Sequence, residues 1–166
     1  MKKANHLHTF KFVTSLFLLL STVGLFSCYL KKALTDSAPK QTTKELTDKT
    51  RVEFEHLFFD GAREKLLGNY DLAETHFLHA LRVDPTNAAT MYELGTVYTF
   101  QNNKNQALIY SKKAALADPK NIWYQLLYAE CLKENKQPAE VAIVYEKLLQ
   151  QYPDRIDFYY ELANAY

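Results

Sequence analysis

The sequence has few of the residues that interrupt helices: 4 glycines and 5 prolines among 166 residues. This scarcity disfavours both a disordered chain and a turn-rich β-protein, and it favours helices. Two cysteines, Cys28 and Cys131, allow at most one disulfide, which excludes a disulfide-rich scaffold. An excess of one charge is also lacking, since 20 Lys and Arg residues face 19 Asp and Glu residues. Nucleic-acid binding requires a cationic surface, so this balance argues against nucleic acid as a partner.

The amino-terminal residues have the organisation of an export signal. Lys2, Lys3 and Lys11 precede an uncharged, mostly apolar run at 12–27, whose 16 residues are too few to span a bilayer, which takes about 20. A positive start followed by a short apolar run is typical of a secretory signal. The run ends Leu25-Phe26-Ser27-Cys28, which resembles the lipobox of bacterial lipoproteins.

The resemblance implies that Cys28 is lipidated and becomes the first residue of the mature protein. We therefore predict a signal peptide at 1–28 and a lipoprotein anchored to a membrane of the bacterial cell envelope, on its periplasmic or surface face. An uncleaved anchor helix that extends to Leu30 and a cytoplasmic chain are the alternatives. Residues 29–50 are polar, contain Pro39 and lack an apolar period, so we predict a tether there and a folded domain at 51–166.

The folded part has an internal period. Pro85, Pro119 and Pro153 are 34 residues apart and divide the chain into blocks 54–87, 88–121 and 122–155, with an incomplete block at 156–166. Apolar residues recur at helical spacing in each block, and turn residues lie near its middle. Each complete block is therefore predicted to form two helices, the second of which ends before the proline.

The blocks resemble the tetratricopeptide repeat (TPR) family. Block two carries the family's pattern as Met91, Leu94, Gly95, Tyr98, Ala107, Ala114 and Pro119. The resemblance implies an all-α fold: an α-solenoid of antiparallel helix pairs, the TPR superhelix, with about three and a third repeats. Block one has Asp60 and Glu64 where the family has Leu and Tyr, and we expect these charges to be solvated at the start of the array.

The incomplete block has the first-helix pattern without a second helix. We expect it to leave four large side chains uncovered, namely Phe158, Tyr159, Leu162 and Tyr166. The sequence therefore resembles the front part of a longer repeat protein. The alternative is a carboxyl-terminal helix that closes on a partner subunit.

The family resemblance also implies a concave face, lined by the first helices, that binds protein segments. The residues expected to bind a partner there are Phe58, Tyr92, Thr96, Trp123, Leu126 and Tyr160. Several of these are apolar where a clamp for a terminal carboxylate needs cations or amides, so we expect an extended or helical segment with apolar anchors. The alternative is that these side chains only pack between adjacent helices.

Groups for catalysis or metal binding are not evident in the sequence. His76 and His79 are three residues apart but lack a third ligand at a suitable spacing, so we expect no metal and no cofactor. Cys131 lies in an apolar helix and is expected to be buried. The predicted function is a non-catalytic, membrane-tethered scaffold that binds a protein or peptide partner. Alternatives are the recognition arm of an enzyme or sensor whose catalytic domain lies beyond residue 166, and an assembly factor for outer-membrane or surface proteins.

Overall fold

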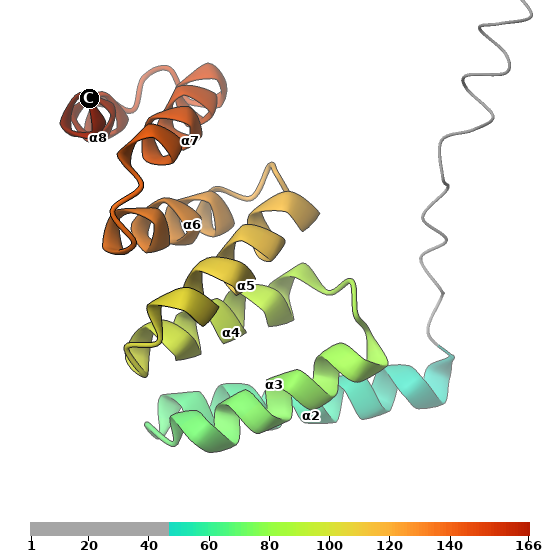
Figure 1. Cartoon of the computed structure of the whole chain (residues 1–166). Coiled ribbons are helices and arrows are strands. Elements are labelled where there is room, and N and C mark those ends of the chain that lie inside the picture. The colour runs from blue at the N-terminus through green and yellow to red at the C-terminus, as the bar shows by residue number, and fades with distance from the viewer. Residues whose placement is uncertain (1–46) are drawn as a thin grey trace, which may run out of the picture. The chain divides into compact units, whose positions relative to one another are not determined.

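The structure, a computed structural model, describes residues 47–166, in which helices are the regular secondary structure (Figure 1). The predicted signal peptide, Cys28 and most of the predicted tether lie outside the described residues. The helices in chain order are α2 (Asp48–Leu66), α3 (Tyr70–Val83), α4 (Ala88–Phe100), α5 (Lys104–Ala117), α6 (Ile122–Glu134), α7 (Pro138–Gln151) and α8 (Ile156–Ala165).

The helices repeat with the period of the prolines. The first helices α4, α6 and α8 begin at residues 88, 122 and 156, and the second helices α3, α5 and α7 begin at residues 70, 104 and 138. Both series advance by 34 residues, and the first series coincides with the predicted starts of the blocks. The all-α solenoid of antiparallel helix pairs is therefore confirmed for the part of the chain that the structure describes.

Asparagine side chains begin two of the first helices. The side chain of Asn87 accepts a hydrogen bond from the backbone N–H of Thr90, and that of Asn121 accepts one from the N–H of Trp123. Such N-caps satisfy backbone donors that have no partner inside the helix. They follow Pro85 and Pro119 by two residues, so the same short sequence ends one repeat and begins the next.

The turn inside each pair uses a residue with positive φ. Gly68, Asn102 and Lys136 have φ angles of 79°, 57° and 56° and are again 34 residues apart. The residue after each of them donates its N–H to a carbonyl five residues earlier, for example Gln137 to Leu132 at 3.0 Å. This arrangement is the Schellman ending of a helix, which satisfies the last free carbonyls.

Helix α2 begins earlier than the sequence predicts. It starts at Asp48 and has 19 residues, whereas α4 and α6 have 13 each. The hydroxyl of Thr47 caps it by accepting the N–H of Thr50 at 3.4 Å. Residues 48–50, which we assigned to the tether, therefore belong to the helix. The error arose because these residues are polar and give no apolar period.

One of the two acids of the first block is not solvated as predicted. Glu64 is buried, and its carboxylate accepts hydrogen bonds from Asn69 at 2.8 Å and from Arg63 at 3.0 Å. These two donors lower the pKa of Glu64, the amide of Asn69 contributing most. Asp60 is half-buried and forms an ion pair with Arg63 at 2.9 Å. One period later the equivalent position holds Tyr98, whose hydroxyl bonds to Glu74 at 2.9 Å.

Small residues bring the two helices of a pair together. Ala73 of α3 is fully buried in a first hydrophobic cluster that also contains Phe77 and Leu94. A β-carbon at Gly61 of α2 would lie 2.9 Å from the ring of Phe77, so only glycine fits this crossing without a shift. A β-carbon at Gly95 of α4 would lie 3.2 Å from the backbone nitrogen of Ser111 in α5.

A second cluster joins α6, α7 and α8. It contains Leu132, Leu148 and Phe158, each at most 1% exposed. The prediction that Phe158 is uncovered is therefore wrong, because its ring packs against Tyr145 at 5.8 Å between ring centroids. Tyr159 and Tyr166 are exposed, at 52% and 86%, as predicted.

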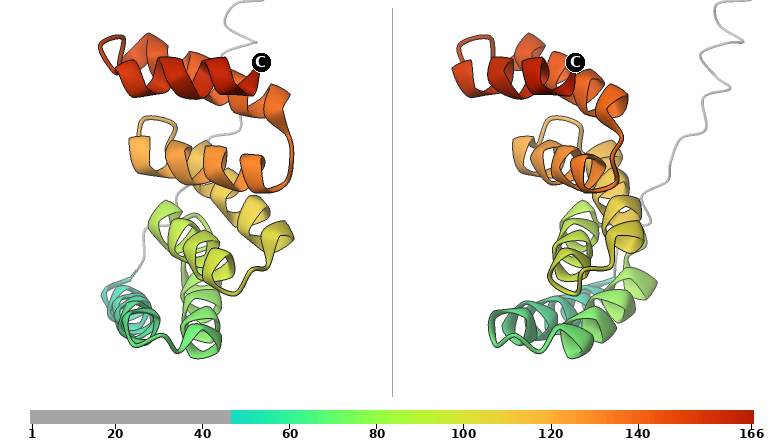
Figure 2. Two further views of the ribbon diagram at one scale, coloured as in Figure 1. Left: turned by 90° about the vertical axis from the view of Figure 1, so that its left-hand side faces the viewer. Right: turned by 60° about the vertical axis from the view of Figure 1, so that its left-hand side comes forward.

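The pairs stack so that each second helix contacts the next first helix. Contacts join α3 to α4, α5 to α6 and α7 to α8, and further contacts join α2 to α4 and α4 to α6. In the second view of Figure 2, α4 and α6 lie to the left of α5. First and second helices therefore form opposite sides of the array.

Candidate functional site

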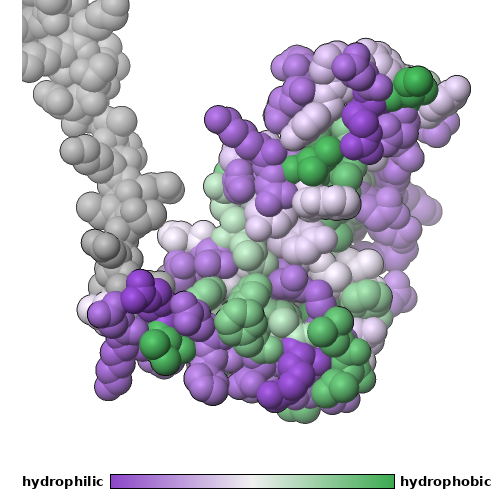
Figure 3. Space-filling model, turned by 180° about the vertical axis from the view of Figure 1, so that it is seen from behind, coloured by the Kyte–Doolittle hydropathy of each residue, from purple (hydrophilic) through white to green (hydrophobic). Residues whose placement is uncertain are grey.

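The first candidate surface is the face formed by α2, α4, α6 and α8, which we call the first-helix face. Contacts between neighbouring first helices and an ion pair from Lys133 of α6 to Glu161 of α8 make it continuous. Figure 3 shows the array from behind Figure 1, where apolar and polar side chains are interspersed and no single apolar strip stands out. Any partner site on this face must therefore depend on individual side chains.

Two of the predicted binding residues pack into the clusters. Phe58 is half-buried, lies edge-on to Phe77 at 5.7 Å between ring centroids, and belongs to the periphery of the first cluster. Leu126 is half-buried and packs against the second cluster. Both side chains therefore take part in packing between helices.

Tyr92 and Thr96 lie at the junction of α4 with α6. The half-buried ring of Tyr92 lies 5.1 Å from that of Tyr124, with 35° between their planes. The hydroxyl of Thr96 donates to the carbonyl of Tyr92 at 3.0 Å. Both side chains thus already have partners inside the array, and Tyr92 offers only part of its ring to an outside molecule.

Trp123 and Tyr160 are the two predicted binding residues that remain open. Trp123, at the start of α6, is 66% exposed, and Tyr160, in α8, is 70% exposed. No aromatic stacking partner within residues 47–166 contacts either ring. Exposed Trp and Tyr side chains supply large contact areas at protein interfaces. Among the six predicted binding residues, these two are therefore the most exposed.

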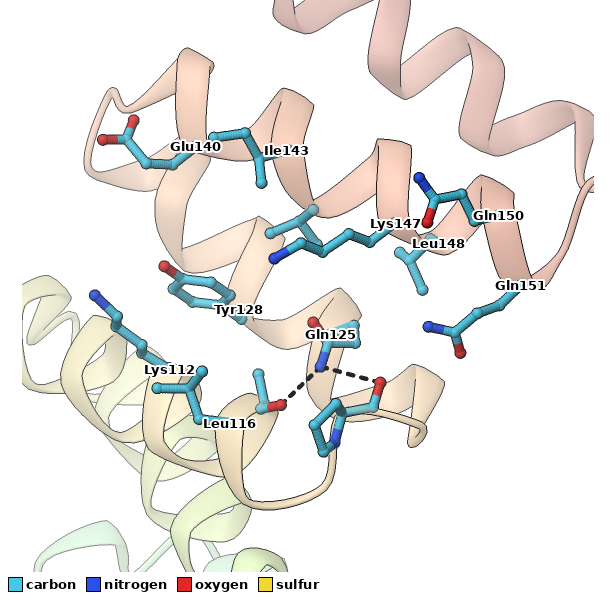
Figure 4. A pocket seen from close by; sticks show the side chains of 13 residues that line it. Lys112, Leu116, Gln125, Tyr128, Glu140, Ile143, Lys147, Leu148, Gln150 and Gln151 are labelled. Carbon is cyan, nitrogen blue, oxygen red and sulfur yellow. Dashed lines mark hydrogen bonds between the residues drawn. The ribbon is translucent and has the colours of Figure 1, made fainter. Parts of the chain in front are cut away.

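A second candidate surface is a groove of about 480 Å³ that sequence reasoning missed. It lies between α5 and α7, over the ring of Tyr128 from α6 (Figure 4). Leu116 of α5 and Ile143 of α7 form apolar walls and are 69% and 49% exposed. Gln125 closes one end by donating to the carbonyl of Ala115 at 2.8 Å, as Figure 4 shows.

The charges around this groove are mostly basic. Lys112 and Lys147 extend along it, Glu140 lies at one end, and neither lysine forms an ion pair with any described residue. Burial raises the pKa of Tyr128, so its phenol stays neutral at physiological pH. The groove thus offers apolar walls with two free cations at its edge.

Other chemistry is weakly represented in residues 47–166. Cys131 is 3% exposed, and burial raises the pKa of its thiol, so this cysteine is buried as predicted and is not a reactive thiolate. The same residues contain no group of three or more His, Cys, Asp or Glu side chains placed to hold a metal ion. Nor does any helix in this range have the length and apolar character needed to cross a membrane.

Comparison with known sequences identifies the repeats. The sequence pattern of the tetratricopeptide repeat family matches residues 88–121 and residues 120–165. Residues 88–165 therefore carry the sequence pattern of tetratricopeptide repeats. The chain is also 34% identical over 100 residues to tetratricopeptide repeat protein 37 of Xenopus laevis, a match that covers 55% of this chain and 6% of that protein. The chain therefore spans a small part of this relative's length.

Solved TPR structures share the fold. The TPR domain of Arabidopsis OM64 is 17% identical with a TM-score of 0.61, and the match covers 70% of this chain and 96% of that one. The type III secretion chaperone SycD of Yersinia enterocolitica, solved with a peptide of the translocator YopD, is also 17% identical with a TM-score of 0.61. That match covers 74% of this chain and 96% of SycD. At a sequence identity of 17%, these similarities show a shared fold and no more.

A comparison of successive TPR repeats explains the groove. Tyr110, which stacks on Tyr98 at 5.5 Å between ring centroids, corresponds to Val144 one period later. Leu81, which packs against the first cluster, corresponds to Ala115. The groove between α5 and α7 is thus lined by the smaller Ala115 and Val144 at the positions of Leu81 and Tyr110. An alignment of the blocks with one another would have shown this difference, whereas the shared repeat pattern does not.

Proposed function

We propose that residues 47–166 form a non-catalytic protein-interaction module that binds a segment of a partner protein on the first-helix face. The proposal rests on one observation: Trp123 is 66% exposed on a rigid helix and has no aromatic partner among the described residues. The Trp side chain has only two rotatable bonds and so loses little conformational freedom on binding, which makes it a suitable anchor for an interface.

The solved TPR structures support this kind of function. SycD holds a translocator peptide, and the first TPR domain of Spaghetti (RPAP3) holds an HSP90 peptide with the sequence SRMEEVD. In the present chain, Tyr92 and Leu126 take places where a carboxylate clamp would need cations or amides. We therefore expect a partner segment with apolar or aromatic anchors, such as one that an envelope assembly factor would hold.

The groove between α5 and α7 is the second candidate surface for the same function. Its volume, its apolar walls and its two free lysines suit a segment in which an apolar side chain is flanked by acidic ones. The two surfaces lie on opposite sides of the array, and each carries an equally exposed apolar residue, Trp123 at 66% and Leu116 at 69%.

Site-specific photo-cross-linking separates the two surfaces. We expect p-benzoylphenylalanine at position 123 or 160 of the full chain, expressed in cells, to give the same covalent partner adduct. The same amino acid at position 116 is the matched control and should give none. An adduct from position 116 alone would assign the partner to the groove. Absence of adducts from all three positions would contradict the interaction function.

The contribution of single side chains to partner affinity can then be measured with alanine variants. Trp123→Ala should weaken binding of the identified partner segment by about 2 kcal/mol or more, and it should leave the melting temperature unchanged because the ring is exposed. Tyr92→Ala should lower the melting temperature, because its ring packs against Tyr124. A fall in melting temperature with unchanged affinity in Trp123→Ala would show that Trp123 only packs.

We further propose that Cys28 anchors the module to a membrane of the bacterial cell envelope. The support is the lipobox-like sequence that ends the apolar run. Two or three acyl chains suffice for stable anchoring, since each buried methylene contributes about 0.8 kcal/mol. Cys28→Ala should therefore leave an uncleaved precursor and abolish metabolic labelling by a fatty-acid analogue. Unchanged labelling would refute the lipoprotein assignment.

A further inference from the structure

Helix α2 presents a row of exposed apolar side chains on the side that faces away from α3 and α4. Val52, Phe59 and Leu66 are 56%, 66% and 83% exposed and are spaced by seven residues, so they lie on one side of the helix. We call these three residues the α2 stripe. The row extends over about 21 Å of helix.

The repeat pattern shows why this side of α2 is significant. Phe59 corresponds to Glu93 in α4 and to Glu161 in α8, one and three periods later. Glu93 forms an ion pair with Lys65 of the preceding first helix, and Glu161 forms one with Lys133. This position therefore faces the preceding helix of the array, and in α2 it carries an exposed phenylalanine.

We propose that the α2 stripe pairs with the α2 stripe of a second copy of this chain, antiparallel and around a two-fold axis at Phe59. The stripe has one apolar residue seven positions before Phe59 and one seven positions after it. In an antiparallel pair, Val52 of each copy therefore lies beside Leu66 of the other copy. The two Phe59 side chains lie beside each other at the centre. A closed dimer of this kind uses the same surface in both copies.

The charges beside the stripe select the antiparallel direction. Glu55 lies four residues before Phe59 and Arg63 four residues after it; both are exposed, and Arg63 also pairs with Asp60 and Glu64 of its own helix. An antiparallel pair brings Glu55 of each copy level with Arg63 of the other, whereas a parallel pair brings Glu55 level with Glu55. Like charges at a helix interface disfavour that pairing.

The segment directly before α2 is a poorer occupant than a second copy. Residues 35–47 contain Ala38, Pro39 and Leu46 as their only apolar residues, so this segment has one large apolar side chain and no row to match the stripe. The contact of one helix with one helix should bury less surface than a stable interface, which buries about 1,200 Å² or more in total. The dimer should therefore be weak and concentration-dependent.

Cysteine cross-linking in the full chain tests the pairing and its direction. Phe59→Cys should give a covalent dimer with a short bismaleimide. A mixture of the Val52→Cys and Leu66→Cys variants should give a cross-linked dimer with one copy of each. Either variant alone should give little cross-linked dimer, because its two introduced cysteines would lie about 21 Å apart in the antiparallel pair. The chain without an added cysteine gives the background from Cys28 and Cys131. Ile109→Cys, at an exposed position on α5, is the matched control.

Each cross-linking result either supports or overturns the proposed dimer. Dimers from Val52→Cys alone and from Leu66→Cys alone would overturn the antiparallel arrangement. A yield from Phe59→Cys no higher than that from Ile109→Cys would overturn the dimer, and this result would also follow if residues 1–46 cover the stripe. Phe59→Lys should lower the average mass measured by light scattering, whereas Leu116→Lys should not. Circular dichroism checks that both variants stay helical.

Discussion

At the scale of single residues, Lys136 carries the clearest backbone strain. Its φ angle is 56°, and it occupies the position that Gly68 and Asn102 occupy in the preceding repeats. The left-handed conformation costs a residue with a β-carbon about 1–2 kcal/mol. Lys136 is exposed and forms no ion pair with the described residues, so its side chain offers no evident compensation.

Lys136→Gly should therefore raise the free energy of unfolding by about 0.5–1 kcal/mol, because the relief of strain exceeds the added entropy of glycine in the unfolded chain. Urea denaturation of the two proteins measures the difference. Gly68→Ala is the opposite change at the equivalent turn. It should destabilise the protein even though no atom lies within 4 Å of the added β-carbon. An unchanged midpoint in both variants would show that these turns relax.

At the scale of elements, the starts of α4 and α6 could be predicted from the sequence. Pro85 and Asn87, and likewise Pro119 and Asn121, place a helix stop and an N-cap at fixed spacing, and local chemistry of this kind depends little on distant contacts. Helices α4 and α6 accordingly begin at the predicted residues. The small residues Gly61 and Ala73 lie at the close crossing of α2 and α3 that the structure contains.

Features that depend on differences between repeats could not be predicted in the same way. The start of α2 was missed because its first turn is polar and so has no apolar period. The groove between α5 and α7 was missed because it arises from the smaller Val144 and Ala115 in one repeat. Among the predicted binding residues, the sequence could not separate exposed Trp123 from packed Phe58, because both are aromatic and both lie on first helices.

At the scale of the whole array, two hydrophobic clusters divide the described residues. The first is built mainly from α2 to α5 and contains Phe77. The second is built from α6 to α8 and contains Leu148. Leu108 of α5 packs against both. Because a repeat array is held by contacts between neighbours, a defect at one end should loosen that end first.

Phe77→Ala removes a fully buried ring from the first cluster, at a cost of about 3–5 kcal/mol. Since about 1.4 kcal/mol corresponds to a factor of ten, amide hydrogen exchange in α2 and α3 should accelerate by about 100-fold or more. Exchange in α7 should change much less. The matched variant Leu148→Ala removes a side chain that is 1% exposed from the second cluster and should show the reverse pattern. Equal acceleration in all helices by either variant would instead show that the two clusters unfold as one cooperative unit, through the contact that Leu108 makes with both.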